Sequence, residues 1–166
     1  MRQSVFLDEL TDSDVAEHLA DEPSTVLVPT GSTEQHGAHG PLGTDVTIPR
    51  EVCRRVAQTK AALVAPPVPY GISQGHKGFK GLAYLSVDIY LKVIEDLVLS
   101  LAESGFRRIV FINGRYTNYP AINLALLNCS SRLSDGAEAF ALSYWDALPP
   151  DEQEEYLGIK LDCTRT

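Results

Sequence analysis

Short apolar runs alternate along the chain with longer segments in which apolar and polar residues recur at helical spacing. The apolar runs predict strands and cover residues 24–32, 61–71, 107–114 and 137–145. The amphipathic segments predict helices and cover residues 11–20, 45–61, 86–105 and 120–136. Runs that are apolar throughout indicate strands buried on both faces. The pattern therefore predicts an α/β fold: a single domain over residues 1–166, with a mostly parallel β-sheet flanked by helices on both faces.

Three predicted connections follow the ends of the first three strands. They cover residues 31–45, 70–82 and 113–118. In open parallel sheets, ligands bind beyond the carboxyl ends of the strands, so we expect these connections to form a site. The second connection is rich in glycine and carries His76, and a long loop in a compact domain is usually functional or mobile.

The first connection, GSTEQHGAHGPLGTD, concentrates metal-binding side chains between glycines. Glu34 and His36 are two residues apart, so in an extended segment both side chains project to the same side. Asp45 begins the next predicted helix and can bring a second carboxylate to the same point. Mixed histidine and carboxylate ligation favours zinc or manganese over calcium. The alternative is that the two acids cap turns, while His36 and His39 lie on the surface.

Composition narrows the classes of partner and compartment. The 14 basic and 22 acidic residues give a net charge of -8, which argues against a nucleic-acid partner. The three cysteines, Cys53, Cys129 and Cys163, are widely spaced and form no CxxC pair, so they predict neither a disulfide framework nor a zinc knuckle. The sequence shows no signal peptide and no apolar run of membrane-spanning length. We therefore expect a soluble, cytoplasmic protein without a membrane partner.

Three segments in order resemble the motifs of the creatininase family of metal-dependent amidohydrolases. They are LVPTGSTEQHGAHGPLGTD, GISQGHKGFKGLAYLS and RRIVFINGRYTN. The resemblance implies a compact α/β fold, a homo-oligomer that is often a hexamer, and a two-metal site for cyclic amides or related ring substrates. It also implies that Glu34, His36 and Asp45 are metal ligands, with Asp45 bridging two ions, and that His76 lines the substrate pocket.

The third motif departs from the family pattern at two positions. Arg115 stands where the family has a metal-binding histidine, and Thr117 stands where creatininase-like members place a carboxylate ligand. An arginine cannot ligate a metal, because its guanidinium stays protonated and offers only donors. Beside Glu34 and Asp45 it would pair with the carboxylates and replace one positive charge. We therefore expect one zinc or manganese ion rather than two.

The end of the sequence also differs from the family, whose chains continue further with a segment rich in histidine and glutamate. This difference is consistent with a C-terminally truncated or altered member. Trp145, near the end of the fourth strand, is a candidate substrate-binding residue, although a tryptophan there is more often part of the packing. His39 and Tyr116 are further candidates for substrate binding.

The leading hypothesis is a hydrolase in which a metal-activated water attacks the carbonyl of a small-molecule substrate, a cyclic amide or related ring compound. His76 and Arg115 are the candidate catalytic residues, with His76 as the proton donor. One alternative is a catalytically impaired structural or regulatory subunit that assembles with a full-length homologue. Another is a metal-free binder, in which Arg115 clamps an anionic small molecule.

Overall fold

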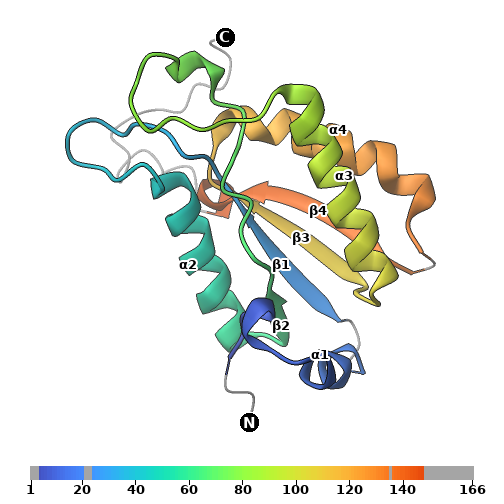
Figure 1. Cartoon of the computed structure of the whole chain (residues 1–166). Coiled ribbons are helices and arrows are strands. Elements are labelled where there is room, and N and C mark those ends of the chain that lie inside the picture. Colours follow the sequence, from blue (N-terminus) through green and yellow to red (C-terminus); the bar gives the residue numbers. More distant parts are fainter. Residues whose placement is uncertain (1–3, 21–23, 135, 148–166) are drawn as a thin grey trace.

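The structure, a computed structural model, describes residues 4–20, 24–134 and 136–147. At its centre is a four-stranded parallel sheet with the strand order β2-β1-β3-β4 (Figure 1). The strands are β1 (Thr25–Thr30), β2 (Ala62–Val64), β3 (Arg108–Asn113) and β4 (Glu138–Ser143). The predicted fold class is confirmed, because every strand pair is parallel and helices lie on both faces.

Two apolar cores hold the helices on the sheet. The helices are α1 (Asp12–Leu19), α2 (Thr44–Thr59), α3 (Val87–Glu103) and α4 (Tyr119–Cys129). One core joins α3 and α4 to the sheet face that carries Val28 and Phe111. The other joins α2 to the opposite face through Leu27 and Ile112. Alternate residues of β1 and β3 thus point into different cores, which explains why these strands are apolar throughout.

Several element boundaries differ from the predictions. The second strand ends at Val64 instead of reaching residue 71, because the prolines that follow have no N–H for a sheet ladder. Helix α4 ends at Cys129, and residues 130–132 continue as a 3-10 turn in which the Ser130 hydroxyl donates to the Leu127 carbonyl. Helix α2 begins at Thr44 and ends at Thr59, with Pro49 inside it.

Pro49 leaves the carbonyl of Asp45 without its usual helical donor, because proline has no N–H to give to the residue four positions earlier. This carbonyl lies against the ends of β1 and β3. A Cβ added at Gly31 or at Gly114 would overlap the Asp45 carbonyl oxygen. Only glycine fits at both positions, and this close packing places the first turn of α2 beside the carboxyl ends of two strands.

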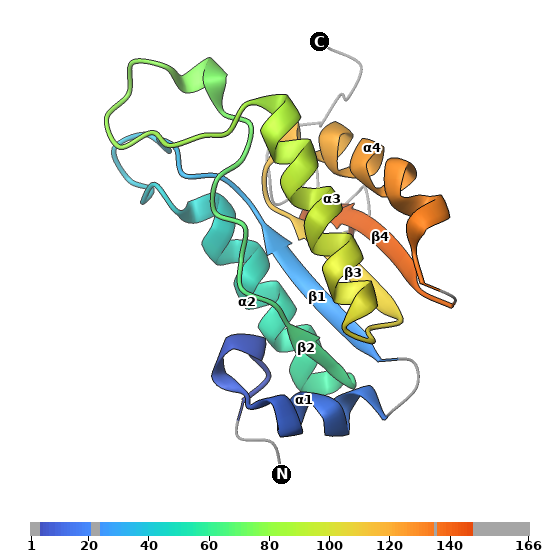
Figure 2. The ribbon, with the colours of Figure 1, turned by 45° about the vertical axis from the view of Figure 1, so that its right-hand side comes forward.

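The connections that follow β1 and β2 extend beyond the same end of the sheet (Figure 2). They contain the segments 31–43 and 65–86, the second of which includes a 3-10 turn at Gln74–His76. The third connection, after β3, forms a 3-10 turn at Tyr116–Asn118 that leads into α4. Among the described residues, no helix is long and apolar enough to cross a membrane.

Candidate metal centre

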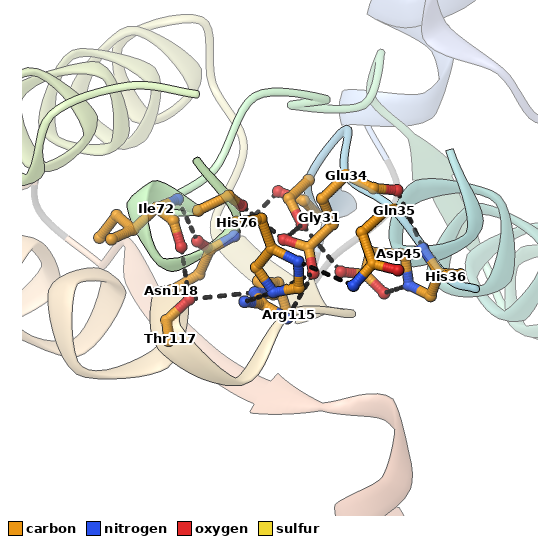
Figure 3. Close-up of polar contacts among 12 residues, drawn as sticks. Gly31, Glu34, Gln35, His36, Asp45, Ile72, His76, Arg115, Thr117 and Asn118 are labelled. Atoms are coloured by element: carbon orange, nitrogen blue, oxygen red, sulfur yellow. Dashed lines mark hydrogen bonds and ion pairs between the residues drawn. The ribbon is translucent and has the colours of Figure 1, made fainter. Parts of the chain in front are cut away.

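The three predicted ligands meet at this end of the sheet. Each of Glu34, His36 and Asp45 offers one ligand atom, and these atoms lie within 4.8 Å of one another (Figure 3). Glu34 and His36 come from the loop after β1, and Asp45 comes from the first turn of α2. Within the described part of the chain, this is the group of histidine and carboxylate side chains that can hold a metal ion.

His36 and Asp45 form the more open half of the cluster. The His36 Nε2 atom lies 2.8 Å from Asp45 Oδ1, and the His36 Nδ1 atom lies 3.1 Å from the backbone oxygen of Glu34. Both neighbours are acceptors. A neutral imidazole that donates from Nδ1 to the carbonyl therefore turns the Nε2 lone pair toward the carboxylate. Only a proton or another cation between these two atoms makes the contact favourable.

Glu34 forms the closed half, since its side chain is 1% exposed and both of its oxygens have partners. Oε1 lies 2.6 Å from Arg115 Nη1 and 3.2 Å from His76 Nε2. Oε2 accepts hydrogen bonds from the hydroxyls of Ser73, at 2.6 Å, and Ser32, at 2.9 Å. A buried carboxylate is stable only when it is paired and hydrogen-bonded, and here Arg115 supplies the countercharge.

His76 is held in one orientation by a neighbouring amide. The Gln35 Oε1 atom accepts from the Gly37 N–H at 2.9 Å, so the amide nitrogen of Gln35 faces His76 Nδ1 at 3.2 Å. This nitrogen can only donate, which leaves the proton of a neutral His76 on Nε2, where Glu34 Oε1 accepts it. The contact between His76 Nε2 and Arg115 Nη2 at 3.2 Å then joins two donors and contributes no hydrogen bond.

Ser32 connects the two halves of the cluster. Its hydroxyl lies 2.9 Å from Glu34 Oε2 and 2.8 Å from Asp45 Oδ2. The two carboxylates therefore share the single hydroxyl proton of Ser32. Arg115 balances the charge of Glu34 alone. The described site has one negative charge more than its fixed positive charges, and this excess lies at Asp45.

The remaining predicted site residues, His39, Tyr116 and Trp145, are not part of this cluster in the described part of the chain. His39 and Tyr116 are exposed, and within the described residues neither takes part in the hydrogen-bond network of Glu34 and Asp45. Trp145 is partly buried and packs edge-on against Tyr144, with ring centroids 5.0 Å apart. Burial and, to a smaller extent, the negative charge of Asp45 raise the pKa of Tyr144.

Three residues that contact the site were missed at the level of sequence: Ser32, Gln35 and Ser73. Ser32 had a signal, because it precedes Glu34 by two positions in the same extended segment. Ser73 and Gln35 had none, since their roles depend on how the second loop folds over the first. Arg115 pairs with Glu34 as expected, whereas the partner of Asp45 is His36 and not the arginine.

Comparison with known proteins identifies the family of the chain. The family model described as creatinine amidohydrolase (creatininase) matches residues 8–159. The chain belongs to the creatininase family. Creatinine amidohydrolase of Pseudomonas putida is 35% identical over an alignment of 155 residues, which covers 88% of this chain and 60% of that relative. The mycofactocin precursor peptide peptidase of Mycolicibacterium smegmatis is 42% identical over an alignment of 110 residues, which covers 61% of this chain and 43% of the relative.

Solved creatininase structures share the fold of this family member. A crystal structure of creatinine amidohydrolase superposes with a TM-score of 0.84 at 34% identity, covering 96% of this chain and 66% of that protein. A mutant creatininase of the Zn-Zn type gives a TM-score of 0.83 at 33% identity, with the same two shares. A creatininase described with Mn gives 0.81. The chain thus spans about three fifths of the length of the creatinine amidohydrolase it matches.

Proposed function

We propose that this protein hydrolyses the amide bond of a small cyclic amide or related ring compound, with one zinc or manganese ion held by Glu34, His36 and Asp45. The observation that carries the proposal is the convergence of Glu34, His36 and Asp45, whose ligand atoms all lie within 4.8 Å of one another. The related creatinine amidohydrolase and the creatininase structures described with zinc or manganese support the reaction class and the metal.

The side chains fit one ion better than two. Three protein ligands with an open position are a common catalytic arrangement, and the cluster offers one carboxylate oxygen or imidazole nitrogen from each of three residues. A second ion beside Glu34 would have to displace the guanidinium of Arg115, which lies 2.6 Å from Oε1. Arg115 therefore takes the charge-balancing role of a second cation without being able to ligate or activate water.

The chain's own residues have distinct roles in the proposed reaction. A bound divalent ion supplies a nucleophilic water near neutral pH and polarises the scissile carbonyl. His76 holds a proton at Nε2, and we assign to it a hydrogen bond to the leaving nitrogen, which takes up the proton that the attacking water releases. Arg115 has donors beyond its contacts with Glu34, His76 and Thr117, and we assign these to an oxygen of the substrate.

A second candidate is supported by the closed half of the site. Glu34 has partners for both oxygens without any metal, so the Arg115 pair can stabilise the fold of a chain that has lost the chemistry. Such a chain would act as a structural or regulatory subunit, or would bind an anionic small molecule at Arg115. The two candidates differ in whether the natural protein holds a metal ion.

The test is the metal content of the full chain, purified without added metal and then dialysed against zinc or manganese. We expect about one ion per chain by inductively coupled plasma mass spectrometry, in line with three available ligands. Asp45→Asn is the matched control, since it keeps the shape of the side chain and removes the charge. Ring opening of creatinine to creatine, and formation of new amino groups from short peptides, would then be followed for the loaded protein.

Each result decides between the candidates. One ion together with ring opening supports the proposal, and one ion with peptide cleavage alone would correct the substrate class. Two tightly held ions would overturn the one-ion site. No ion in the natural chain, combined with metal binding by Arg115→His, would show that the arginine has disabled the site and would favour the second candidate.

A further inference from the structure

We propose that Thr117 is a positioning residue that holds the guanidinium of Arg115 against Glu34, and thereby weakens metal binding at the neighbouring ligands. This inference rests on the proposed one-ion site, and it concerns a residue that belongs to no predicted ligand set. It arises from a chain of hydrogen bonds that runs from Arg115 through the Thr117 hydroxyl to the second loop.

The directions of these hydrogen bonds are fixed by chemistry. Arg115 Nε can only donate, and it lies 3.1 Å from Thr117 Oγ1. The Ile72 carbonyl can only accept, and it lies 2.5 Å from the same hydroxyl. The Thr117 proton must therefore point to Ile72, while a lone pair of its oxygen receives the arginine. A carboxylate at residue 117 could accept from Arg115 but could not donate to Ile72.

Ile72 is a firm anchor because its N–H is bound as well. It donates to Asn118 Oδ1 at 2.8 Å, and the amide nitrogen of Asn118 donates to the Gly31 carbonyl at 2.9 Å. Asn118 is fully buried. Thr117 and Asn118, which are adjacent in the third loop, thus bind the carbonyl and the N–H of Ile72. Asn118 also binds Gly31 at the start of the first loop.

The backbone of Arg115 is fixed separately by Asn113. The Arg115 N–H donates to Asn113 Oδ1 at 3.0 Å, and Asn113 Nδ2 donates to the Arg115 carbonyl at 2.7 Å. With the backbone held in this way, Thr117 is the contact that sets the direction of the side chain. The guanidinium is then left with one strong partner, the Glu34 oxygen at 2.6 Å. Arg115 and Thr117, the two departures from the family motif, therefore act as one unit (Figure 3).

The consequence for metal binding is competition for Glu34. An ion that uses this carboxylate must draw charge away from the ion pair with Arg115, so a firmly held arginine lowers metal affinity. Loss of the Thr117 contact frees the guanidinium to leave Glu34 for solvent. We therefore expect a chain without the Thr117 hydroxyl to bind zinc or manganese more tightly than the natural chain.

The test compares Thr117→Val, which keeps the shape and removes the hydroxyl, with Thr117→Ser, which keeps the hydroxyl. Manganese affinity is measured by titration of metal-free full-length protein. We expect Thr117→Val to bind about tenfold more tightly, the size of one hydrogen bond from a charged donor, and Thr117→Ser to bind like the natural chain. In an Arg115→Gln background, Thr117→Val should change the affinity by less than about twofold, because the hydroxyl acts through the arginine.

A measurement without metal separates this inference from the proposed function. Urea unfolding in chelator gives a double-mutant cycle for Thr117→Val and Arg115→Gln, and we expect the two changes to be coupled. If no variant binds metal while the coupling is present, the proposed function fails and the positioning role stands. If metal binds but the coupling is absent, or Thr117→Val weakens affinity equally in both backgrounds, Thr117 is only a tie to Ile72 and the inference is wrong.

Discussion

The two halves of the site contain the same kind of carboxylate but surround it differently. Glu34 is 1% exposed and has an arginine, a histidine and two serine hydroxyls as partners, whereas the side chain of Asp45 is 13% exposed and has His36 and Ser32. The first carboxylate is neutralised by the protein itself. The second lies 2.8 Å from His36 Nε2, an atom that can ligate a metal when the imidazole proton is on Nδ1. Within one cluster, the charge of Glu34 is therefore balanced by the protein's own side chains, whereas the charge of Asp45 is left for a metal ion to balance.

The strongest way to test this comparison is to remove the built-in cation. Arg115→Met leaves Glu34 buried without a countercharge, and loss of one partner of a buried pair typically destabilises a protein by about 3–5 kcal/mol. We expect a loss in the free energy of unfolding toward this range in chelator, measured by urea denaturation. Added zinc or manganese should restore part of the loss, since an ion can then balance Glu34. A loss that metal does not reduce would contradict the proposal that Glu34 can pair with either Arg115 or a metal ion.

The open half is tested by Asp45→Asn, which we expect to weaken metal binding by at least about a hundredfold, or about 2.7 kcal/mol. The reason is that the amide cannot balance the ion's charge, although it still accepts from the Ser32 hydroxyl. Isothermal titration of metal-free protein measures the change. Stability in chelator should fall much less than in Arg115→Met, because Asp45 is less buried and its partner His36 can be neutral. Equal losses of stability in Asp45→Asn and Arg115→Met would contradict the distinction between the open and the closed half of the site.

Much of this arrangement could be predicted from the sequence, and the limits have physical causes. Continuous apolar runs identified the strands, because a parallel sheet buries both faces, and the spacing on the first loop predicted that the candidate ligands lie close together. The prolines after Val64 were read as part of a strand, since an apolar run does not show where ladder hydrogen bonds stop. Ser73 and Gln35 act across loops, so no pattern within one segment could reveal that they orient Glu34 and His76.

Gly31→Ala tests whether the position of Asp45 depends on its close packing with β1. The new Cβ would overlap the Asp45 carbonyl oxygen, so the first turn of α2 must shift. We expect a destabilisation of about 1–3 kcal/mol, typical of overpacking, and a fall in metal affinity because Asp45 moves with the turn. Gly75→Ala is the matched control, since a Cβ there meets nothing within 4 Å. Unchanged metal affinity in Gly31→Ala would show that the open half does not depend on this packing.

The smallest effect on stability is expected for an exposed carboxylate–arginine pair, Glu51 and Arg54. This pair is a reference for the buried pair of Glu34 and Arg115. Arg54 donates to both oxygens of Glu51 on the surface of α2, and hydrogen bonds from Arg54 and Arg55 lower the pKa of Glu51 to about 2. Because water screens such pairs, we expect Arg54→Met to change the urea midpoint far less than Arg115→Met.

The sign of the pH dependence follows from the lowered pKa of Glu51. The contribution of a carboxylate whose pKa is lower in the folded state is present above its ordinary value of 4.5, and it is lost as the pH falls from there toward about 2. The difference between natural chain and Arg54→Met should therefore be small at neutral pH and should disappear in this acidic range. Equal losses of stability in Arg54→Met and Arg115→Met would contradict the view that the burial of Glu34 makes its pairing with Arg115 important for stability.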